Sequence, residues 1–339
     1  MAAVQEINPS IGFEIFTLVP QWFFEQSNIK RVGYHAVNTD IGLVQKTPLK
    51  ADLPATIVRL DEFLPFKPGT IAGIAKEIEN HCRLIICDIS PLGIAIALEL
   101  GIPSILIENF TWDWLYQGYR KYAGSLKKHI RYLRNHYDRA DYHVQTEPLC
   151  HRRDSDLVTA PVSRKRRTPG DVVRGKLNIP SHAKVVLVTM GGISENYSFI
   201  EQLSKFSGIH FVIPGAGRQI QILDNVIILP PSSPYFHPDL VHAADAVIGK
   251  AGYSTLAEVF CAGVPFGYIE RRGFRESRHL VAFIEKYMNG RPIEAGSFYK
   301  GGWLADLNDI ISLPRIKREG PNGADQIARF IIDMINREN

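Results

Sequence analysis

Short apolar runs alternate with stretches of helical periodicity along most of the chain. Apolar runs bounded by Gly, Pro, Asn or Asp are typical of buried strands. Parallel strands need crossover connections, so the alternation predicts an α/β fold. In the first half we predict strands at 13–19, 31–37, 84–88, 104–108 and 142–145, and helices at 70–80, 93–100 and after Asn109. The second half gives strands at 184–190, 210–214, 226–229, 246–249 and 265–269, with helices at 197–206, 238–244, 254–262 and 277–289.

The pattern also predicts two domains. Residues 148–180 lose periodicity and gather basic residues, which is typical of a linker without a helix. At 339 residues the chain exceeds the length at which one core usually stops growing. We therefore expect domains at 1–160 and 161–319. Residues 320–339 contain an amphipathic helix that must pack on another element, and we expect it to return to the first domain.

Composition and charge exclude several classes of protein. A content of 45% hydrophobic and 22% charged residues is ordinary for an ordered globular chain. The net charge of +4 is too small for a nucleic-acid footprint, although it suits an anionic small ligand. The helix after Asn109 has a basic face that weak peripheral contact with a membrane would explain, but a solvated face is the commoner explanation. That face contains Arg120, Lys121, Lys127, Lys128, Arg131 and Arg134.

The N-terminus and the cysteines indicate a cytoplasmic protein. Residues 1–6 lack the basic and apolar regions of a signal peptide. The apolar stretch 84–110 is interrupted by charged residues and prolines, so we interpret it as strand, helix and strand. The four cysteines share no C-x-x-C spacing and are expected to be reduced. We expect no metal and no cofactor.

Two glycine-containing segments resemble phosphate-binding loops only in part. In 170–177 the last position is Leu177, which has no hydroxyl for Mg²⁺. The segment at Gly215 and Gly217 lacks the third glycine of a dinucleotide fingerprint. The sequence therefore disfavours both a P-loop kinase and a Rossmann dehydrogenase.

The strongest chemical signal is the segment 246–258. A buried strand runs into a loop with Gly249, Lys250 and Gly252, and then into a helix that begins with Ser254 and Thr255. Free amides, hydroxyls and the helix dipole at such a point suit a diphosphate. A capping box between Thr255 and Glu258 is the alternative explanation for that pair, and Lys250 could be a solvated loop residue.

The loop after the strand 184–190 is a second candidate. Gly191 and Gly192 follow this strand directly, where backbone amides can approach a phosphate closely. A tight turn between a strand and a helix explains the same glycines equally well.

The segment 246–258 resembles the donor lobe of GT-B glycosyltransferases, especially the group of the peptidoglycan N-acetylglucosaminyltransferase and the galactolipid synthases. The resemblance implies two Rossmann-like parallel-sheet domains that face each other across a cleft. It also implies a nucleoside-diphosphate-sugar as co-substrate, most often a UDP-sugar. By position, the residues that it assigns are Gly252, Ser254 and Thr255 on the diphosphate, Glu258 on the ribose, and Arg275 and Glu276 on the donor sugar.

A second resemblance covers more of the chain. The segments 87–91, 108–116 and 248–253 are similar to the glycosyltransferase-like N-terminal half of L-arabinokinases. No sugar-kinase core follows, so phosphate transfer is not implied. Such proteins open with a strand and a loop rich in Gly and His, whereas this sequence begins in the helix expected after that loop. We therefore expect either that the start was placed downstream of the true one, or that the first strand of the N-terminal domain is missing, and with it part of the acceptor site that catalysis needs.

Together these features predict metal-independent transfer of a hexose-type sugar to an unknown acceptor. Lys250 and the two phosphate loops would stabilise the leaving group. Asp88 is the candidate base, although an Asp before Ser-Pro is also a common turn former. Glu108 and Asn109 end a strand on the acceptor side. A non-catalytic protein that binds sugar nucleotides is the main alternative, and a nucleotide-sugar 2-epimerase ranks third.

Overall fold

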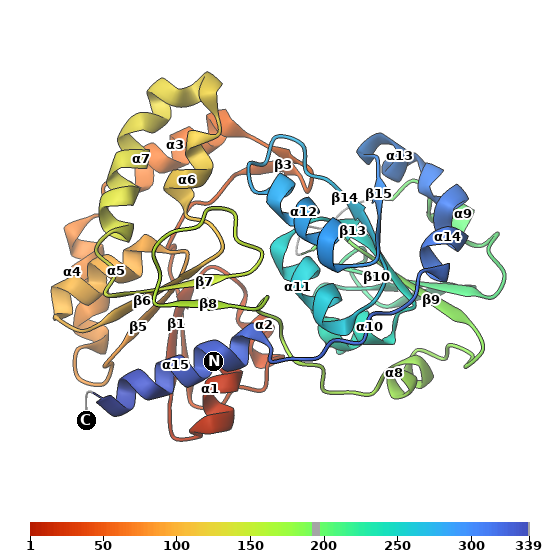
Figure 1. The fold of residues 1–339 in the computed structure, drawn as a ribbon, viewed down its shortest axis with the longest axis horizontal. Helices are drawn as coiled ribbons and strands as arrows, with labels where there is room; N and C mark the ends of the chain where they lie inside the picture. The colour runs from red at the N-terminus through yellow and green to blue at the C-terminus, as the bar shows by residue number, and fades with distance from the viewer. Residues whose placement is uncertain (192–196, 338–339) are drawn as a thin grey trace.

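The computed structural model describes residues 1–191 and 197–337, which form two α/β lobes (Figure 1). The second lobe contains one sheet in the order β11-β12-β10-β9-β13-β14-β15, parallel except for β11. Its strands are β9 (Lys184–Thr189), β10 (Ile209–Pro214), β11 (Gln221–Leu223), β12 (Val226–Leu229), β13 (Ala246–Lys250), β14 (Phe266–Ile269) and β15 (Gly290–Ile293). This lobe confirms the predicted parallel-sheet α/β class.

Apolar layers cover both faces of this sheet. Leu187 and Val247 belong to one cluster of buried side chains, and their neighbours Val188 and Ile248 belong to another. Strands buried on both faces are nearly continuous apolar runs, which is why the sequence identifies them. The helices of this lobe are α8 (Gly170–Lys176), α9 (Ile200–Leu203), α10 (His237–Ala243), α11 (Tyr253–Ala262), α12 (Ser277–Tyr287), α13 (Ala295–Lys300), η2 (Gly302–Asp306) and α14 (Leu307–Ser312).

The first lobe divides its strands between separate sheets. Strands β5 (Ile85–Asp88), β6 (Ser104–Glu108), β7 (Tyr142–Thr146) and β8 (Leu157–Thr159) form one parallel sheet. Strands β1 (Phe13–Thr17) and β2 (Val32–Ala36) form a parallel pair, and β3 (Gln45–Thr47) and β4 (Lys50–Ala51) form a hairpin. The helices are α1 (Ala2–Ile7), α2 (Gln21–Glu25), α3 (Leu53–Phe63), α4 (Pro68–Ile78), α5 (Pro91–Leu100), α6 (Trp112–Gln117), η1 (Arg120–Tyr122) and α7 (Ala123–Tyr137).

The segment 148–180 is not free of regular structure, so that part of the prediction is wrong. Strand β8 extends the sheet by pairing with β7, with Thr159 opposite Thr146. Helix α8 buries Val173 in the core of the second lobe. Both elements are too short to produce a visible hydrophobic period, and tertiary contacts hold them in place.

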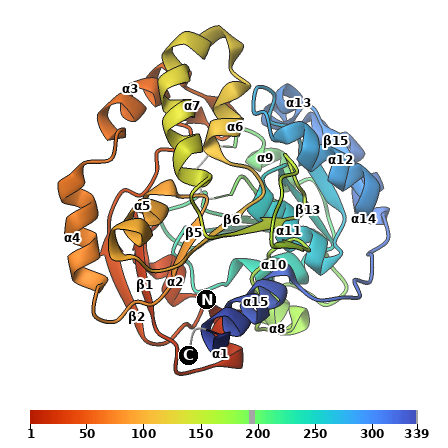
Figure 2. The ribbon, with the colours of Figure 1, turned by 60° about the vertical axis from the view of Figure 1, so that its left-hand side comes forward.

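The last helix, α15 (Gly323–Arg337), crosses back from the second lobe to the first. Its residues Ile327 and Ile331 share a cluster with Val4 of α1 and Ile105 of β6. Figures 1 and 2 both show α15 beside α1 and the N-terminus. The helix therefore closes one face of the first lobe.

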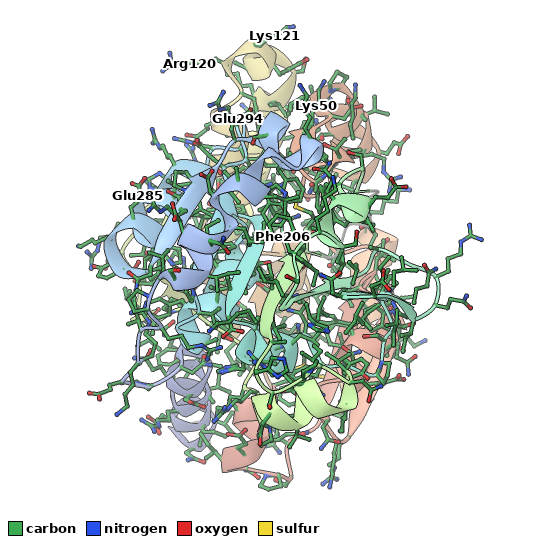
Figure 3. The ribbon with its side chains drawn as sticks, turned by 90° about the vertical axis from the view of Figure 1, so that its right-hand side faces the viewer. Lys50, Arg120, Lys121, Phe206, Glu285 and Glu294 are labelled. Atoms are coloured by element: carbon green, nitrogen blue, oxygen red, sulfur yellow. The ribbon has the colours of Figure 1, made fainter. Side chains whose placement is uncertain are left out.

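The basic face of α7 is partly paired within the protein. Lys128 lies 2.5 Å from Asp61, and Arg134 lies 3.2 Å from Asp113. Arg120 and Lys121 project outward at the tip of this region (Figure 3). Within the described ranges, no helix combines the length and the apolar character needed to cross a bilayer.

Candidate functional site

A large cavity lies between the two lobes. Its volume is about 1420 Å³, which exceeds that of an ordinary small-molecule pocket. Residues of both lobes line it, among them Asp88 from the first lobe and Gly191, Ser254 and Glu258 from the second. The carboxyl ends of parallel strands are where ligands of open α/β sheets bind. The structure therefore brings the predicted base to the same cavity as five of the predicted donor residues, which are Gly191, Ser254, Thr255, Glu258 and Glu276.

The turn from β13 to α11 points a helix N-terminus at this cavity. The N-cap of α11 is Gly252, and no side chain caps the first turn. Tyr253, which follows, donates its hydroxyl hydrogen to Oγ1 of Thr146 in the first lobe at 2.8 Å. Ser254 and Thr255 both line the cavity. Uncapped amides beside hydroxyls form a site for an anion.

Gly249 allows β13 to lie directly against β9. A Cβ atom at this position would stand 2.2 Å from the backbone oxygen of Thr189. No side chain fits that space, because the obstacle is the backbone of the neighbouring strand. The glycine thus positions both loops that face the cavity, the one after Thr189 and the one after Lys250.

Replacing Gly249 with Ala is therefore expected to destabilise the protein by about 1–3 kcal/mol, since overpacking a core strains its backbone. Urea unfolding of the purified variant measures this effect. Gly73 of α4 is the matched control: it is exposed, and a Cβ atom there would have no heavy atom within 4 Å. Gly73→Ala should stabilise by about 0.5–1 kcal/mol. Equal stabilities for the two variants would contradict the close approach of β13 to β9 at Gly249.

Glu258 forms a buried ion cluster and not the capping box considered above. Its Oε1 accepts from Nη2 of Arg164 at 3.0 Å, and its Oε2 lies 2.5 Å from Nδ1 of His237. The N-cap of the helix is Gly252, so Thr255 is not its N-cap. Burial opposes ionisation of Glu258, but His237 and Arg164 outweigh it and lower the pKa of this carboxyl. Glu258 is thus held charged at the wall of the cavity.

Lys250 lies beside the loop of Gly191. A Cβ atom on Gly191, whose φ is +71°, would stand 3.2 Å from Cε of the lysine. Burial, together with the charge of Arg271, lowers the pKa of Lys250 to about 8. Its ammonium group is therefore mostly charged at neutral pH. Gly192, the other predicted residue of this loop, lies outside the described residues.

Arg275 and Glu276 are neighbours in the sequence, but their side chains have different surroundings. Glu276 lines the cavity, accepts from Nη1 of Arg271 at 3.4 Å, and leaves Oε2 without a hydrogen-bond partner in the described chain. Burial raises the pKa of this carboxyl. Arg275 instead stacks on Trp114 of the first lobe, with its guanidinium carbon 4.1 Å from the ring centre. Arg275 joins the two lobes, whereas Glu276 and Arg271 line the cavity.

Asp88 is a predicted residue whose acidity is strongly perturbed. Its side chain lines the cavity between the lobes, which protein surrounds. No hydrogen bond to its carboxylate is found in the described chain. Burial, with a smaller contribution from the charge of Asp40, raises the pKa of Asp88 to about 6. Asp40 itself accepts from Nε1 of Trp112 at 2.9 Å. A carboxylate with this pKa suits a general base near neutral pH.

Glu108 and Asn109 face the cavity but are largely engaged inside the first lobe. Oε1 of Glu108 lies 2.8 Å from Nε2 of His143 and accepts from Nε2 of Gln145, also at 2.8 Å. Asn109 donates to the sulfur of Cys150 at 3.6 Å. The contacts of Glu108 link β6 to β7, and Asn109 links the end of β6 to the segment after β7, so both residues have a structural role.

Arg164, His237 and Arg271 are site residues that the sequence did not identify. Arg164 belongs to a basic run in the segment between the lobes, and its guanidinium carbon lies 4.6 Å from the ring centre of Phe23 and 4.9 Å from that of Phe236. Nothing in the local sequence separates Arg164 from its basic neighbours. His237 precedes Pro238 at the start of α10, which is the one local signal that could have marked it.

Comparison of the sequence with known proteins finds two distant relatives. No family model matches the chain. It is 25% identical over 323 residues to L-arabinokinase of Arabidopsis thaliana, which covers 94% of this chain and 31% of that protein. It is also 27% identical over 215 residues to an uncharacterized glycosyltransferase of Methanopyrus kandleri, covering 56% and 57%. The chain thus spans about a third and about half of these relatives.

Solved structures of glycosyltransferases share the two-lobed fold. The calicheamicin glycosyltransferase CalG4 matches with a TM-score of 0.59 at 12% identity, over 99% of this chain and 89% of that one. An Arabidopsis thaliana enzyme complexed with UDP-L-rhamnose matches with 0.58 at 11%, over 100% and 91%. MurG of Acinetobacter baumannii matches with 0.53 at 13%, over 99% and 94%. The chain therefore has the GT-B fold.

Proposed function

We propose that this chain transfers a hexose-type sugar from a nucleoside-diphosphate-sugar, with UDP as the favoured nucleotide, to an acceptor hydroxyl. The observation that carries the proposal is the convergence of the α11 N-terminus, Glu258 and Asp88 on one cavity. One neighbour of the same fold was solved with UDP-L-rhamnose, which supports the choice of donor.

The donor would bind along the edge of the second lobe. The amides of Tyr253 and Ser254 and the Lys250 ammonium group provide positive charge for a diphosphate. Glu258 has carboxylate lone pairs beyond those used by Arg164 and His237, and these can accept from ribose hydroxyls. The two basic partners hold the carboxylate in one orientation. Glu276 has a free oxygen for a hydroxyl of the sugar.

The transfer step breaks the bond from the sugar C1 to the diphosphate oxygen and forms a bond from C1 to the acceptor oxygen. The hydroxyl proton passes to the carboxylate of Asp88. Negative charge that develops on the diphosphate is stabilised by the helix N-terminus and by Lys250. These groups supply positive charge from the protein, so the proposed mechanism requires no bound metal.

Titration with UDP, GDP, dTDP and their sugar conjugates tests the donor site. At about 100 times its dissociation constant, a ligand adds about 2.7 kcal/mol of stability, which a thermal-shift assay detects as a raised melting temperature. We expect one nucleotide to stabilise the protein. If none of them does in a well-folded sample, the proposed function is wrong.

A non-catalytic protein that binds sugar nucleotides is the second candidate. The similarity to L-arabinokinase favours it, because the match covers 31% of a protein whose name describes a kinase. In that case one nucleotide would still raise the melting temperature, but neither transfer nor hydrolysis of its sugar conjugate would be detected.

A further inference from the structure

The turn that follows Asp88 contains a strained residue. Ile89 has a φ of +59°, in the left-handed region of the backbone. Within the described ranges, five residues other than glycine have a positive φ, and Ile89 is the one whose side chain branches at Cβ. A branched side chain crowds the backbone in this region, so the conformation costs free energy. It persists only where the surrounding structure holds it, and such residues cluster at functional sites.

The packing of α5 explains why the chain turns at Ile89. Helix α5 begins at Pro91 and lies directly against β5, since a Cβ atom on Gly93 would stand 2.6 Å from the sulfur of Cys87. Two residues, Ile89 and Ser90, therefore join the end of the strand to a helix packed on it. Ser90 is extended (φ −79°, ψ 116°), as expected before a proline, so the change of direction falls on Ile89.

This turn fixes the end of β5. The amide of Ile89 donates to the carbonyl of Ile107 at 3.1 Å, so the ladder with β6 continues through Asp88 and stops there. Asp88, Ile89 and Ser90 all line the cavity. If Ile89 relaxed to an extended conformation, the chain after the strand would leave in another direction. The Asp88 carboxylate would then move relative to the cavity.

A buried hydroxyl holds the turn from inside the first lobe. Tyr137, the last residue of α7, is 3% exposed and donates its hydroxyl hydrogen to the carbonyl of Ile89 at 2.7 Å. Its oxygen accepts from the backbone amide of Trp112 at the start of α6. Without this hydroxyl, two backbone groups would lose a partner inside the lobe, which is costly. The hydroxyl thus ties the turn after β5 to the helix that follows β6.

The loop after β2 is attached to the same two elements. Trp112 donates from Nε1 to the carboxylate of Asp40 at 2.9 Å, and Ser90 donates its hydroxyl hydrogen to the carbonyl of Thr39 at 2.8 Å. Thr39 and Asp40 both line the cavity. Tyr137 therefore fixes the turn after β5 relative to its neighbours on this side of the cavity.

We propose that Tyr137 is a positioning residue for Asp88, because its hydroxyl holds Ile89 in the left-handed conformation that directs the Asp88 carboxylate toward the acceptor hydroxyl. Among the described residues that line the cavity Tyr137 is absent, so it acts only through the turn. A displacement of about 1 Å can lower a rate by about 10²-fold, which makes the hold on this turn important. The assignment rests on the proposed function, because it takes Asp88 as the base.

Two substitutions at Ile89 test the strain by itself. Glycine enters the left-handed region without a steric cost, whereas alanine does not. Ile89→Gly should therefore melt at a higher temperature than Ile89→Ala. At an extended or right-handed position the order would be reversed, because glycine loses more conformational freedom on folding. Equal melting temperatures, or a higher one for Ile89→Ala, would overturn the proposal.

Tyr137→Phe tests the hydroxyl, since it keeps the ring. The assay measures release of UDP, with water as the acceptor, from the UDP-hexose that raises the melting temperature most. We expect the rate to fall about 10- to 100-fold. Nucleotide affinity should be unchanged, because the donor site belongs to the second lobe. Tyr132→Phe is the matched control: Tyr132 also lies on α7, and its hydroxyl accepts from the amide of Phe66 at 3.0 Å. It should release UDP at the wild-type rate.

A rescue experiment separates positioning from a general loss of structure. In the Tyr137→Phe background, Ile89→Gly should recover most of the lost rate, since glycine populates the left-handed region about as readily as the right-handed one. Ile89→Ala in the same background should recover little. A merely structural role for the hydroxyl predicts no such difference, because neither substitution restores a contact.

The proposed function and the role of Tyr137 fail through different results. If no nucleotide binds, if the wild type binds a UDP-hexose without turnover, or if Asp88→Asn keeps the wild-type rate, the proposed function with Asp88 as base is wrong and the role of Tyr137 falls with it. If Asp88→Asn is impaired and Tyr137→Phe is not, the role of Tyr137 alone is wrong.

Two further results would also contradict this role. One is an equal loss of rate in Tyr137→Phe and Tyr132→Phe, and the other is an equal rate with glycine and alanine at position 89 in the Tyr137→Phe background. If Tyr137→Phe does not fold, the two double variants replace it, because both relieve the crowding by the branched side chain of Ile89. The glycine variant should then be the faster one, and equal rates contradict the proposal.

Discussion

Replacing Glu258 with Gln is expected to weaken nucleotide binding by about 10- to 150-fold. A hydrogen bond to a charged group contributes about 1.5–3 kcal/mol, and the neutral amide removes that charge. The substitution also leaves Arg164 and His237 without their shared carboxylate, so their orientation toward the cavity is lost. Isothermal titration with the nucleotide that stabilises the wild type measures the change.

Glu99→Gln is the control for this variant, because Glu99 is an exposed glutamate on α5 and lies outside the cavity lining. It should bind the nucleotide with wild-type affinity. Unchanged affinity in Glu258→Gln would show that the nucleotide does not contact this carboxylate and would remove the main support for the donor site.

Replacing Asp88 with Asn is expected to reduce sugar transfer by about 10²- to 10⁴-fold, the range for loss of a general base. Nucleotide binding should be unchanged, because Asp88 belongs to the other lobe. Comparison of turnover with binding in the same preparation separates the two effects. An equal loss of both would indicate that Asp88 supports the structure of the cavity and is not the base.

The pH dependence of transfer gives an independent test of the same assignment. The base must be ionised, and the pKa of Asp88 is about 6, so kcat/KM should fall as the pH drops below that value. The leaving group needs the charged form of Lys250, whose pKa is about 8, so activity should also fall at higher pH. Because the charge of Asp40 contributes to raising the pKa of Asp88, Asp40→Asn should move the acidic limb to lower pH. An acidic limb that stays in place would contradict the assignment of Asp88.

In both lobes the sequence predicts the long buried strands and helices and misses shorter elements. Strand β13 and helix α11 are found close to their expected positions, since long apolar runs between glycines have few alternative structures. Helices α2 and α3 and strand β15 were missed. Helix α3 begins with a side-chain cap from Asp52, a signal that the apolar pattern alone does not include.

The sequence could predict only those site residues that lie close together along the chain. Ser254 and Glu258 could be selected because a strand, a glycine loop and a helix start follow one another within 246–258. Arg164 and Glu258 are 94 positions apart, and only the packing of the linker against α10 and α11 brings them together. The capping-box alternative is wrong because the partners of Glu258 come from distant elements and not from its own helix.

The sequence by itself determined the α/β class, the order of most strands and the start of the helix that faces the cavity. Each of these features depends on residues that are neighbours in the chain. The tertiary structure alone decided the pKa of Asp88, which depends on burial and on Asp40, and the separation of Arg275 from Glu276. It also decided that, among the described strands, β1 pairs with β2 and β5 with β6 in separate sheets, because strand pairing depends on residues that are distant in the sequence.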